Sequence, residues 1–156
     1  NWIICDDNCC DVFNINKEEF GIDIMKVKEI ITYKEPTHIP NCPDFVEGVL
    51  NYRGKVIPVI NLKKRFQMGD TDLTKETRII VISLNDREIG FIVDEASQTI
   101  RLDEDQIDPA PDVISKVDRR FISGVGKINE SRLLIILNLH NVLTDAEKDV
   151  IEEMEL

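Results

Sequence analysis

Cysteine has the most distinctive chemistry of the residues in this sequence, because thiolates bind zinc or iron and carry redox reactions. Three of the four cysteines, Cys5, Cys9 and Cys10, fall within the first ten residues, and Cys42 stands alone. A structural zinc site needs two well-separated pairs of ligands, and C-x3-C-C provides only one group. The spacing therefore favours free thiols of a cytosolic protein, with a metalloprotein or enzyme that uses this group as the alternative.

Neither histidine and none of the acidic runs completes a catalytic or metal site. His38 lies in a proline-containing loop and His140 lies near the C-terminal segment, each without a placed partner. Asp103-Glu104-Asp105 lacks the glycine turn and the final glutamate of a calcium-binding EF-hand loop. The sequence also has no phosphate-binding loop, no G-x-S-x-G and no H-E-x-x-H motif. We therefore predict no enzyme activity, no metal and no cofactor.

Cationic side chains gather at one turn and on the element that follows it. Arg53 and Lys55 lie between two apolar runs, and three more cations occupy residues 63–65. Functional residues concentrate in such turns, and a guanidinium offers a planar fork to a carboxylate. The carboxylate that pairs with Arg53 is either Glu29 of the same domain or an acidic residue of another protein. A solvated surface is the alternative interpretation of the basic set.

The composition excludes several classes of partner. The chain has 156 residues, is 42% hydrophobic and carries a net charge of -11. This charge argues against nucleic acid and against anionic membrane surfaces. No apolar run approaches the ~20 residues of a membrane helix, so we predict no membrane insertion. No signal peptide is recognisable, which predicts a cytoplasmic location. Residues 1–11 are unlike the regular pattern that follows, and we interpret them as an atypical, poorly ordered terminus.

An internal repeat organises the chain. The first pair of similar segments is separated by 69 residues and the second pair by 76. The similar segments are Glu19–Ile24 with Glu88–Val93, Phe45–Val49 with Phe121–Val125, and Val56–Ile60 with Leu133–Leu137. Two copies are too few for a solenoid. The repeat instead predicts two similar halves with a groove between them, where a partner can bind.

Short apolar runs separated by Gly, Pro, Asn and Asp predict a mainly β protein. The expected strands are residues 12–15, 20–24, 28–33, 45–50, 55–60, 78–84, 89–93, 99–102, 121–128 and 132–137, with one helical turn at 25–27 and a short helix at 62–66. Pro58 within one run indicates an edge strand or a bulge. Strands at this spacing are typical of small barrels. Neither half has enough residues for a large core, so we expect the halves to share one.

The C-terminal segment changes to a helical pattern. Thr144 and Glu147 form a capping box, in which the threonine side chain accepts from the glutamate amide and the glutamate side chain reaches back. Ala146, Val150 and Met154 then recur on one face at helical spacing. We therefore predict an α-helix over residues 144–155 that packs on the body of the domain.

From about residue 12 to its end, the chain resembles the CheW-like family of bacterial chemotaxis coupling proteins. The resemblance is carried by the segments Glu19–Ile30, Ile39–Asn41 with Pro43 and Phe45, Gly48–Leu62, Gly90–Asp94, Pro109–Pro111 and Phe121–Gly126. The segment Asn51-x-Arg53-Gly54 with its flanking strands is quite specific to this family. Arg78 is a departure, since an apolar residue is often found there.

The resemblance implies two intertwined five-stranded SH3-like β-barrels and no enzyme activity. The domain would cover 12–156, with copies at about 16–66 and 77–139, and with the N-terminal strand exchanged between them. The implied partners are the regulatory domain of the histidine kinase CheA and the tip of a methyl-accepting chemoreceptor, a helical hairpin that lies in the groove, in membrane-associated arrays. The implied contact candidates are Val27, Glu29, Ile30, Arg53, Arg78 and Ile79. The nearest alternative is a regulatory-domain fragment of a larger kinase or receiver fusion.

Overall fold

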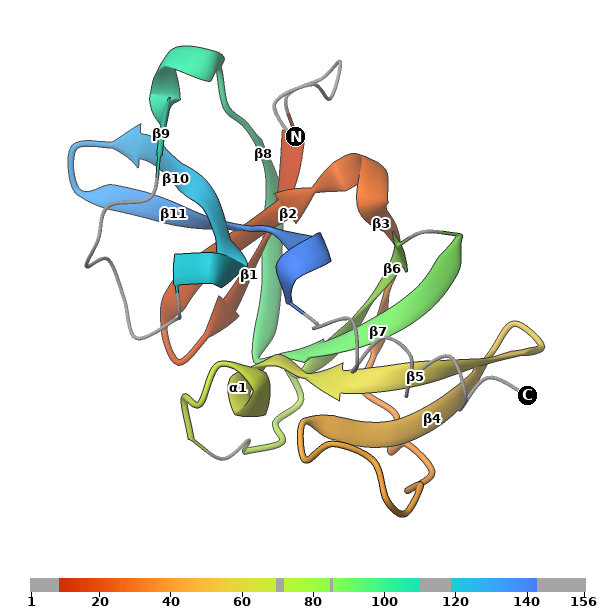
Figure 1. Ribbon diagram of the computed structural model, residues 1–156. Helices are drawn as coiled ribbons and strands as arrows, with labels where there is room; N and C mark the ends of the chain where they lie inside the picture. Colours follow the sequence, from red (N-terminus) through yellow and green to blue (C-terminus); the bar gives the residue numbers. More distant parts are fainter. Residues whose placement is uncertain (1–8, 70–71, 85, 110–118, 143–156) are drawn as a thin grey trace.

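The computed structural model describes residues 9–69, 72–84, 86–109 and 119–142 (Figure 1). These residues form a mainly β protein, as predicted from the sequence. The strands are β1 (Cys9–Ile15), β2 (Glu18–Asp23), β3 (Val27–Thr32), β4 (Val46–Tyr52), β5 (Lys55–Asn61), β6 (Arg78–Leu84), β7 (Arg87–Val93), β8 (Glu95–Arg101), β9 (Ile107–Asp108), β10 (Ile122–Asn129) and β11 (Arg132–Leu137).

The helical elements among the described residues are short. They are η2 (Ile24–Lys26), α1 (Leu62–Arg65), η3 (Glu104–Gln106), η4 (Arg119–Phe121) and η5 (Leu139–Asn141). No described helix is long and apolar enough to cross a membrane. The helix predicted over 144–155 lies outside the described residues, as does most of the N-terminal segment 1–11, of which 9–11 belong to β1.

The strands form two sheets, and each sheet takes strands from both copies of the repeat. The five-stranded sheet has the order β3-β6-β7-β5-β4, and the six-stranded sheet has the order β8-β1-β2-β11-β10-β9. In the repeat, β1 to β5 of the first copy correspond in turn to β6, β7, β8, β10 and β11 of the second. When each strand is exchanged for its equivalent, the order of the five-stranded sheet becomes β8-β1-β2-β11-β10, which is the order of the first five strands of the six-stranded sheet. The two halves are therefore intertwined, as expected. The sixth strand, β9, was not predicted.

Four ladders join strands of different copies: β1–β8 and β3–β6 are antiparallel, and the other two joins are parallel. β2 pairs in parallel with β11, and β7 pairs in parallel with β5, while the other strand pairs are antiparallel. The repeated glycines lie at these joins: a Cβ added to Gly21 would come within 2.8 Å of Leu134, and one added to Gly90 within 2.9 Å of Ile79. Close packing thus explains why glycine occurs at this position in both copies.

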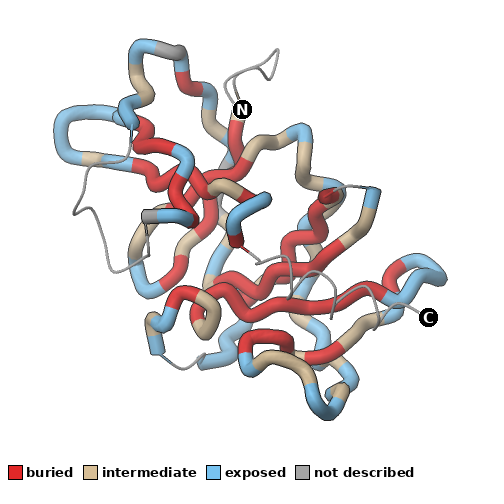
Figure 2. The backbone as a smooth tube through the Cα atoms, viewed as in Figure 1, coloured by how far each residue is buried: buried red, intermediate tan, exposed pale blue. Residues whose placement is uncertain are grey.

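One apolar cluster is shared by the two sheets, as the sequence predicted. It contains residues of both hairpins, including Phe13, Phe20 and Phe91, and residues that precede β4 and β10, Phe45 and Phe121. Figure 2 shows the buried residues running along the strands of both sheets. Two smaller clusters lie on the opposite faces, one for each sheet. Both faces of each sheet are therefore packed, which is why the strands have more apolar residues than one buried face requires.

The expectation that Pro58 marks an edge strand is wrong, and the irregularity of its ladder lies beside it, where the register shifts between Val46 and Gly48. β5 lies inside its sheet, between β7 and β4, and Pro58 stands opposite Val49 in a regular part of the β4–β5 ladder. The parallel pairing with β7 covers only Val59–Asn61. Because this ladder begins after the proline, the missing N–H interrupts no backbone bond to β7.

Candidate functional site

The turn that carries Arg53 is a two-residue hairpin loop between β4 and β5. Arg53 has a φ of 51° and Gly54 a φ of 83°, and the flanking residues Tyr52 and Lys55 form a cross-strand pair. Positive φ at both positions is the geometry that matches the twist of a tight hairpin. The side-chain oxygen of Asn51 accepts a hydrogen bond from the Gly54 amide at 3.0 Å. The Asn-x-Arg-Gly sequence therefore fixes the turn and presents the arginine at its tip.

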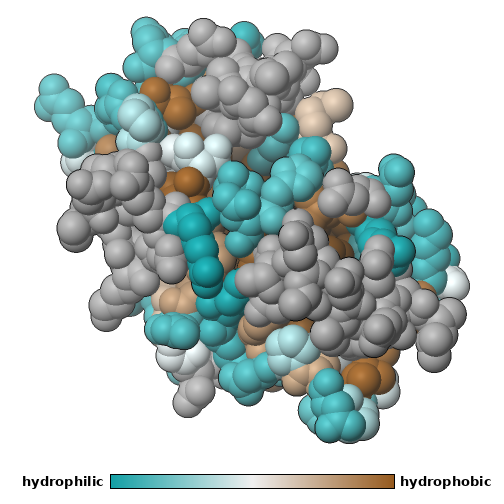
Figure 3. All heavy atoms as spheres, in the orientation of Figure 1, coloured by the Kyte–Doolittle hydropathy of each residue, from teal (hydrophilic) through white to brown (hydrophobic). Residues whose placement is uncertain are grey.

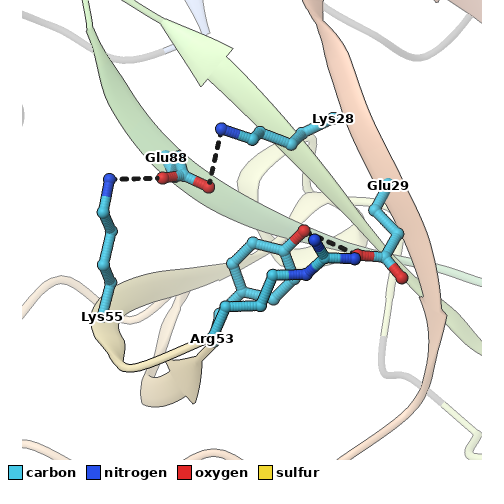
Figure 4. Close-up of polar contacts among 6 residues, drawn as sticks. Lys28, Glu29, Arg53, Lys55 and Glu88 are labelled. Carbon is cyan, nitrogen blue, oxygen red and sulfur yellow. Dashed lines mark hydrogen bonds and ion pairs between the residues drawn. The ribbon is translucent and has the colours of Figure 1, made fainter.

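Glu29 is the carboxylate that pairs with Arg53. It lies on β3 and accepts hydrogen bonds from the Tyr52 hydroxyl and the Arg53 guanidinium, each at 2.7 Å. The guanidinium carbon also lies 5.5 Å from the centre of the Tyr52 ring. Figure 4 shows Arg53 reaching from the β4–β5 turn toward Glu29 on β3. The sequence left two carboxylate partners open for Arg53, one in the same domain and one in another protein. The structure shows the pairing with Glu29 of the same domain.

This contact joins the two edges of the five-stranded sheet. β3 and β4 are the terminal strands in its order, and no backbone ladder links them among the described residues. Glu29 belongs to one edge strand, whereas Tyr52 and Arg53 belong to the other and its turn. The side chains therefore span the edges where the backbone does not.

The hydrogen bonds at Glu29 favour its ionised form. The Tyr52 hydroxyl holds the pKa of the Glu29 carboxyl below its ordinary value, and the positive charges of Arg53 and Lys34 act in the same direction. The same bond raises the pKa of the Tyr52 hydroxyl, because losing that proton would remove the donor and leave two like charges together. At neutral pH the group is a carboxylate held by one phenol and one guanidinium.

A second carboxylate next to the turn is paired with two lysines. Glu88 on β7 accepts from the Lys55 ammonium at 3.0 Å and lies 3.8 Å from the Lys28 ammonium. Figure 4 shows Glu88 between these two lysines, which come from β5 and β3. The cationic residues of the turn are thus arranged around two acidic residues rather than standing in isolation.

The structure separates the predicted contact residues into accessible and internal ones. Arg53 and Ile30 are exposed, and Val27 is partly buried against the shared core. Arg78 is half-buried and donates to the backbone carbonyl oxygens of Lys75 and Thr77 at 2.7 and 3.0 Å. Ile79 is fully buried in the cluster on the other face of the sheet. Its side chain therefore supports the sheet from inside, and a role of Ile79 near the partner contacts stays a prediction.

Sequence reasoning missed Tyr52, Lys28 and Glu88. The signal for Glu88 lies in the repeat, since it is the equivalent of Glu19, which forms a bidentate ion pair with Arg132 across the other parallel join. The sequence gave no sign of a polar role for Tyr52, because an aromatic residue at the end of an apolar run predicts a side chain packed in the core. Its ring is indeed buried, and only its hydroxyl reaches the site.

The described cysteines belong to the packing. Cys10 is buried against Val12 and Leu134, and the Cys42 thiol donates to the backbone carbonyl oxygen of Ile39 at 3.0 Å. Within the described ranges, no group of three or more His, Cys, Asp or Glu side chains is arranged to hold a metal ion.

Comparison with known proteins identifies the class. The model of the CheW-like domain family matches residues 11–147. Chemotaxis protein CheW of Bacillus subtilis is 40% identical over 132 residues, 85% of this chain and 84% of that protein, and CheW of Klebsiella aerogenes is 34% identical over 143 residues, 92% and 86%. The crystal structure of scaffolding protein TtCheW from Thermoanaerobacter tengcongensis superposes with a TM-score of 0.83 at 37% identity, covering 90% of this chain and 95% of that one.

The chain is a mainly β domain in which each of the two sheets takes strands from both copies of the repeat. The chain belongs to the CheW-like domain family.

Proposed function

We propose that this chain is a non-enzymatic chemotaxis adaptor that couples the cytoplasmic tips of methyl-accepting chemoreceptors to the regulatory domain of the histidine kinase CheA. The observation that carries this proposal is the similarity, over most of the chain, to proteins named chemotaxis protein CheW and to a scaffolding protein of known structure. The adaptor acts in the cytoplasm and is recruited to membrane-associated receptor arrays. A regulatory fragment of a kinase or receiver fusion is less well supported, because this chain matches 84–86% of the length of the CheW proteins described above, against 41% of chemotaxis protein CheV3 of Helicobacter pylori.

Each sheet closes into an SH3-like barrel in this proposal, with the domain spanning 12–156 and the copies about 16–66 and 77–139. Two features support closure of the five-stranded sheet. The bonds from Tyr52 and Arg53 to Glu29 tie its two edge strands. The apolar cluster on the face turned away from the shared core also takes side chains from all five strands, among them Ile31, Leu50, Ile57, Ile79 and Ile92. Contributions from every strand to one cluster support a sheet that curls around this cluster, as the strands of a barrel curl around its interior.

The contact candidates act in two ways. Arg53 and Ile30 are accessible and contact a partner directly. Glu29 positions Arg53, and Val27, Arg78 and Ile79 maintain β3 and β6 behind the contact surface. The ion pair with Glu29 holds the guanidinium of Arg53 in one orientation, although the rest of this side chain is exposed.

The test is a binding measurement with Arg53 variants. Arg53→Ala should keep the fold and lower the affinity for the receptor fragment or for CheA by about tenfold or more, the scale of an interface hot spot. Arg53→Lys should restore only part of this loss, because lysine lacks the planar fork. Arg101→Ala, at an exposed arginine on β8 of the other sheet, is the matched control.

The ion pair predicts how two substitutions combine. Since Glu29 is the partner of Arg53, the effects of Glu29→Ala and Arg53→Ala on binding should be non-additive. Additive effects would mean that each residue contacts a partner separately. Unchanged affinity of Arg53→Ala for both CheA and the receptor, together with normal kinase activation, would refute the role assigned to this turn.

A further inference from the structure

Within the described residues, the chain passes between the two sheets twice. It leaves the six-stranded sheet after β2, enters the five-stranded sheet at β3 through the turn η2, and returns to the six-stranded sheet after β7. The return takes a single residue, Asp94, which lies between the last residue of β7 and the first residue of β8. Residues at the ends of elements absorb a change of angle between two rigid parts. Asp94 therefore has the position of a hinge.

A closed ring of polar contacts holds Asp94 in place. Its carboxylate lies 3.0 Å from the ammonium of Lys63 on α1 and accepts a hydrogen bond from the backbone N–H of Asn16 at 2.9 Å. The Asn16 side chain donates to the carbonyl oxygen of Met68 at 2.6 Å. The backbone N–H of Met68 donates in turn to the carbonyl oxygen of Lys63 at 2.8 Å. We call these four residues the Asp94 ring.

The Asp94 ring connects parts of both sheets. α1 follows β5 of the five-stranded sheet, whereas Asn16 lies in the turn between β1 and β2 of the six-stranded sheet. That turn is tight, with φ values of 52° at Asn16 and 70° at Lys17. The backbone N–H of Asp94 also donates to the carbonyl oxygen of Asn14 at 3.0 Å. A change in the angle between the sheets therefore separates the partners within this ring.

Lys63 is the only buried cationic residue in the described part of the chain. The face of the molecule in Figure 3 is largely hydrophilic, with separate hydrophobic patches. The Lys63 side chain, by contrast, is only 8% exposed, and that of Asp94 is 29% exposed. A buried ammonium needs its counter-ion, because a charge that leaves water without a partner is costly. The apolar core brings the sheets together without directional preference, so directional polar contacts are what select one angle between them.

The repeat does not reproduce this ion pair at the crossing through η2. Asn61-Leu62-Lys63 corresponds to Asn138-Leu139-His140, and Asp94 corresponds to Met25 in η2. A thioether carries no charge to pair with a cation, and Met25 is 71% exposed. These two equivalents therefore form no ion pair, and the electrostatic constraint on the angle falls on the crossing at Asp94.

We propose that Asp94 is a locked hinge between the two sheets and that Lys63 is its lock. With the Asp94 ring closed, the sheets keep one relative orientation, which sets the shape of the groove predicted between the two halves. When the ion pair is lost, water can hydrate the partly exposed carboxylate, and the sheets then move about Asp94. Lys63 acts through Asp94 as a positioning residue.

The experiment is a distance measurement on the full chain by pulsed electron paramagnetic resonance. Spin labels on a non-cysteine amino acid at Val56 of β5 and Leu133 of β11 report on the two sheets, since both positions are exposed, and the natural cysteines stay in place. The unaltered chain should give one narrow distance. Lys63→Met removes the charge and keeps an unbranched apolar side chain. It should broaden the distance distribution about twofold or add a second distance.

Lys64→Met is the matched control. Lys64 is the next residue of α1, but its ammonium pairs at 2.7 Å with Glu47 of β4, within the five-stranded half, so this variant should leave the distance unchanged. Lys63→Arg keeps the charge and should restore the narrow distribution. Asp94→Asn keeps an oxygen that accepts from Asn16 and loses the ion pair, so it should broaden the distribution as Lys63→Met does.

Urea denaturation of each variant separates a loss of stability from a change of orientation, because lower stability alone does not broaden the distances of the folded state. An unchanged distribution in either Lys63→Met or Asp94→Asn would overturn the hinge, and so would equal broadening with Lys64→Met. If neither Lys63→Met nor Asp94→Asn folds, the ion pair is a requirement of folding rather than a lock on orientation, and the proposal is wrong. None of these results would bear on the adaptor function.

Discussion

Replacing Asp11 with isoleucine should stabilise the protein. Asp11 is 7% exposed and accepts a hydrogen bond from the Thr99 hydroxyl at 2.6 Å. It stands opposite Ile22, on the face of the six-stranded sheet that contributes to the shared core. In the repeat, the residue of the other sheet that corresponds to Asp11 is Ile80. Asp11 stands opposite Thr99 on β8, and Ile80 stands opposite Ile30 on β3. One copy therefore fills with an isoleucine the position that the other fills with a carboxylate.

The magnitude follows from the two environments. An isoleucine buried as fully as Ile80 contributes about 1.5–3 kcal/mol relative to an exposed one. The lost hydrogen bond to the carboxylate is worth about 1.5–3 kcal/mol, but burying that carboxylate has a desolvation cost of similar size, so these two terms largely cancel. The exposed Thr99 hydroxyl can bond to water instead. We expect a net gain of about 1–2 kcal/mol, or a rise in Tm of roughly 2–8 °C for a domain of this size.

Urea denaturation of Asp11→Ile and of the unaltered chain measures this difference. Asp11→Asn is the matched control, because it removes the charge and keeps a group that can accept from Thr99. The reverse substitution, Ile80→Asp, should be strongly destabilising, since no hydroxyl faces it from β3. An Asp11→Ile protein that is no more stable than the unaltered chain would refute the equivalence of the two positions.

Two further predictions concern a glycine and an ion pair. Gly48→Ala should destabilise the fold by at least about 3 kcal/mol in urea denaturation, because φ is 145° and the new Cβ would lie 2.0 Å from the carbonyl oxygen of Thr37. Gly54→Ala is the control: φ is 83° there and nothing lies within 4 Å of the new Cβ, so this substitution should cost only about 1–2 kcal/mol. The hydrogen bond from Arg132 lowers the pKa of Glu19, so its stabilising effect is present above the ordinary carboxyl pKa and lost as pH falls through the lowered value. Glu19→Gln should therefore lose more stability at about pH 7 than at about pH 3, and an equal loss at both would contradict the ion pair.

The local elements were largely predictable from the sequence. The apolar run at Lys55–Ile60 became β5, and the run at Arg78–Leu84 became β6 without any change of bounds. These elements follow from short-range patterns of apolar residues bounded by turn residues, which act locally. The turn at Arg53 was predicted for the same reason, and its contact with Glu29 was one of two alternatives.

The pairing between strands was not predictable in the same way. Alternation of apolar residues says that a segment is a strand, but it does not name the neighbouring strand. The position of Pro58 inside the sheet depends on where the parallel ladder with β7 begins. The burial of Ile79 also depends on a second cluster on the far face of the sheet, and a run of four apolar residues does not distinguish one buried face from two.

The two parallel joins determine when, during synthesis, the chain can acquire its structure. The Glu19–Arg132 pair that accompanies the join of β2 and β11 links residues 113 positions apart. A ribosome must therefore release nearly the whole domain before β2 meets its second neighbour, and β5 must wait for β7. Contacts of such long sequence separation slow folding, because the entropy of closing the loop is lost before the contact is gained. Nascent chains of this protein will thus carry unpaired strand edges for most of their synthesis, and protection by chaperones matters most in that interval.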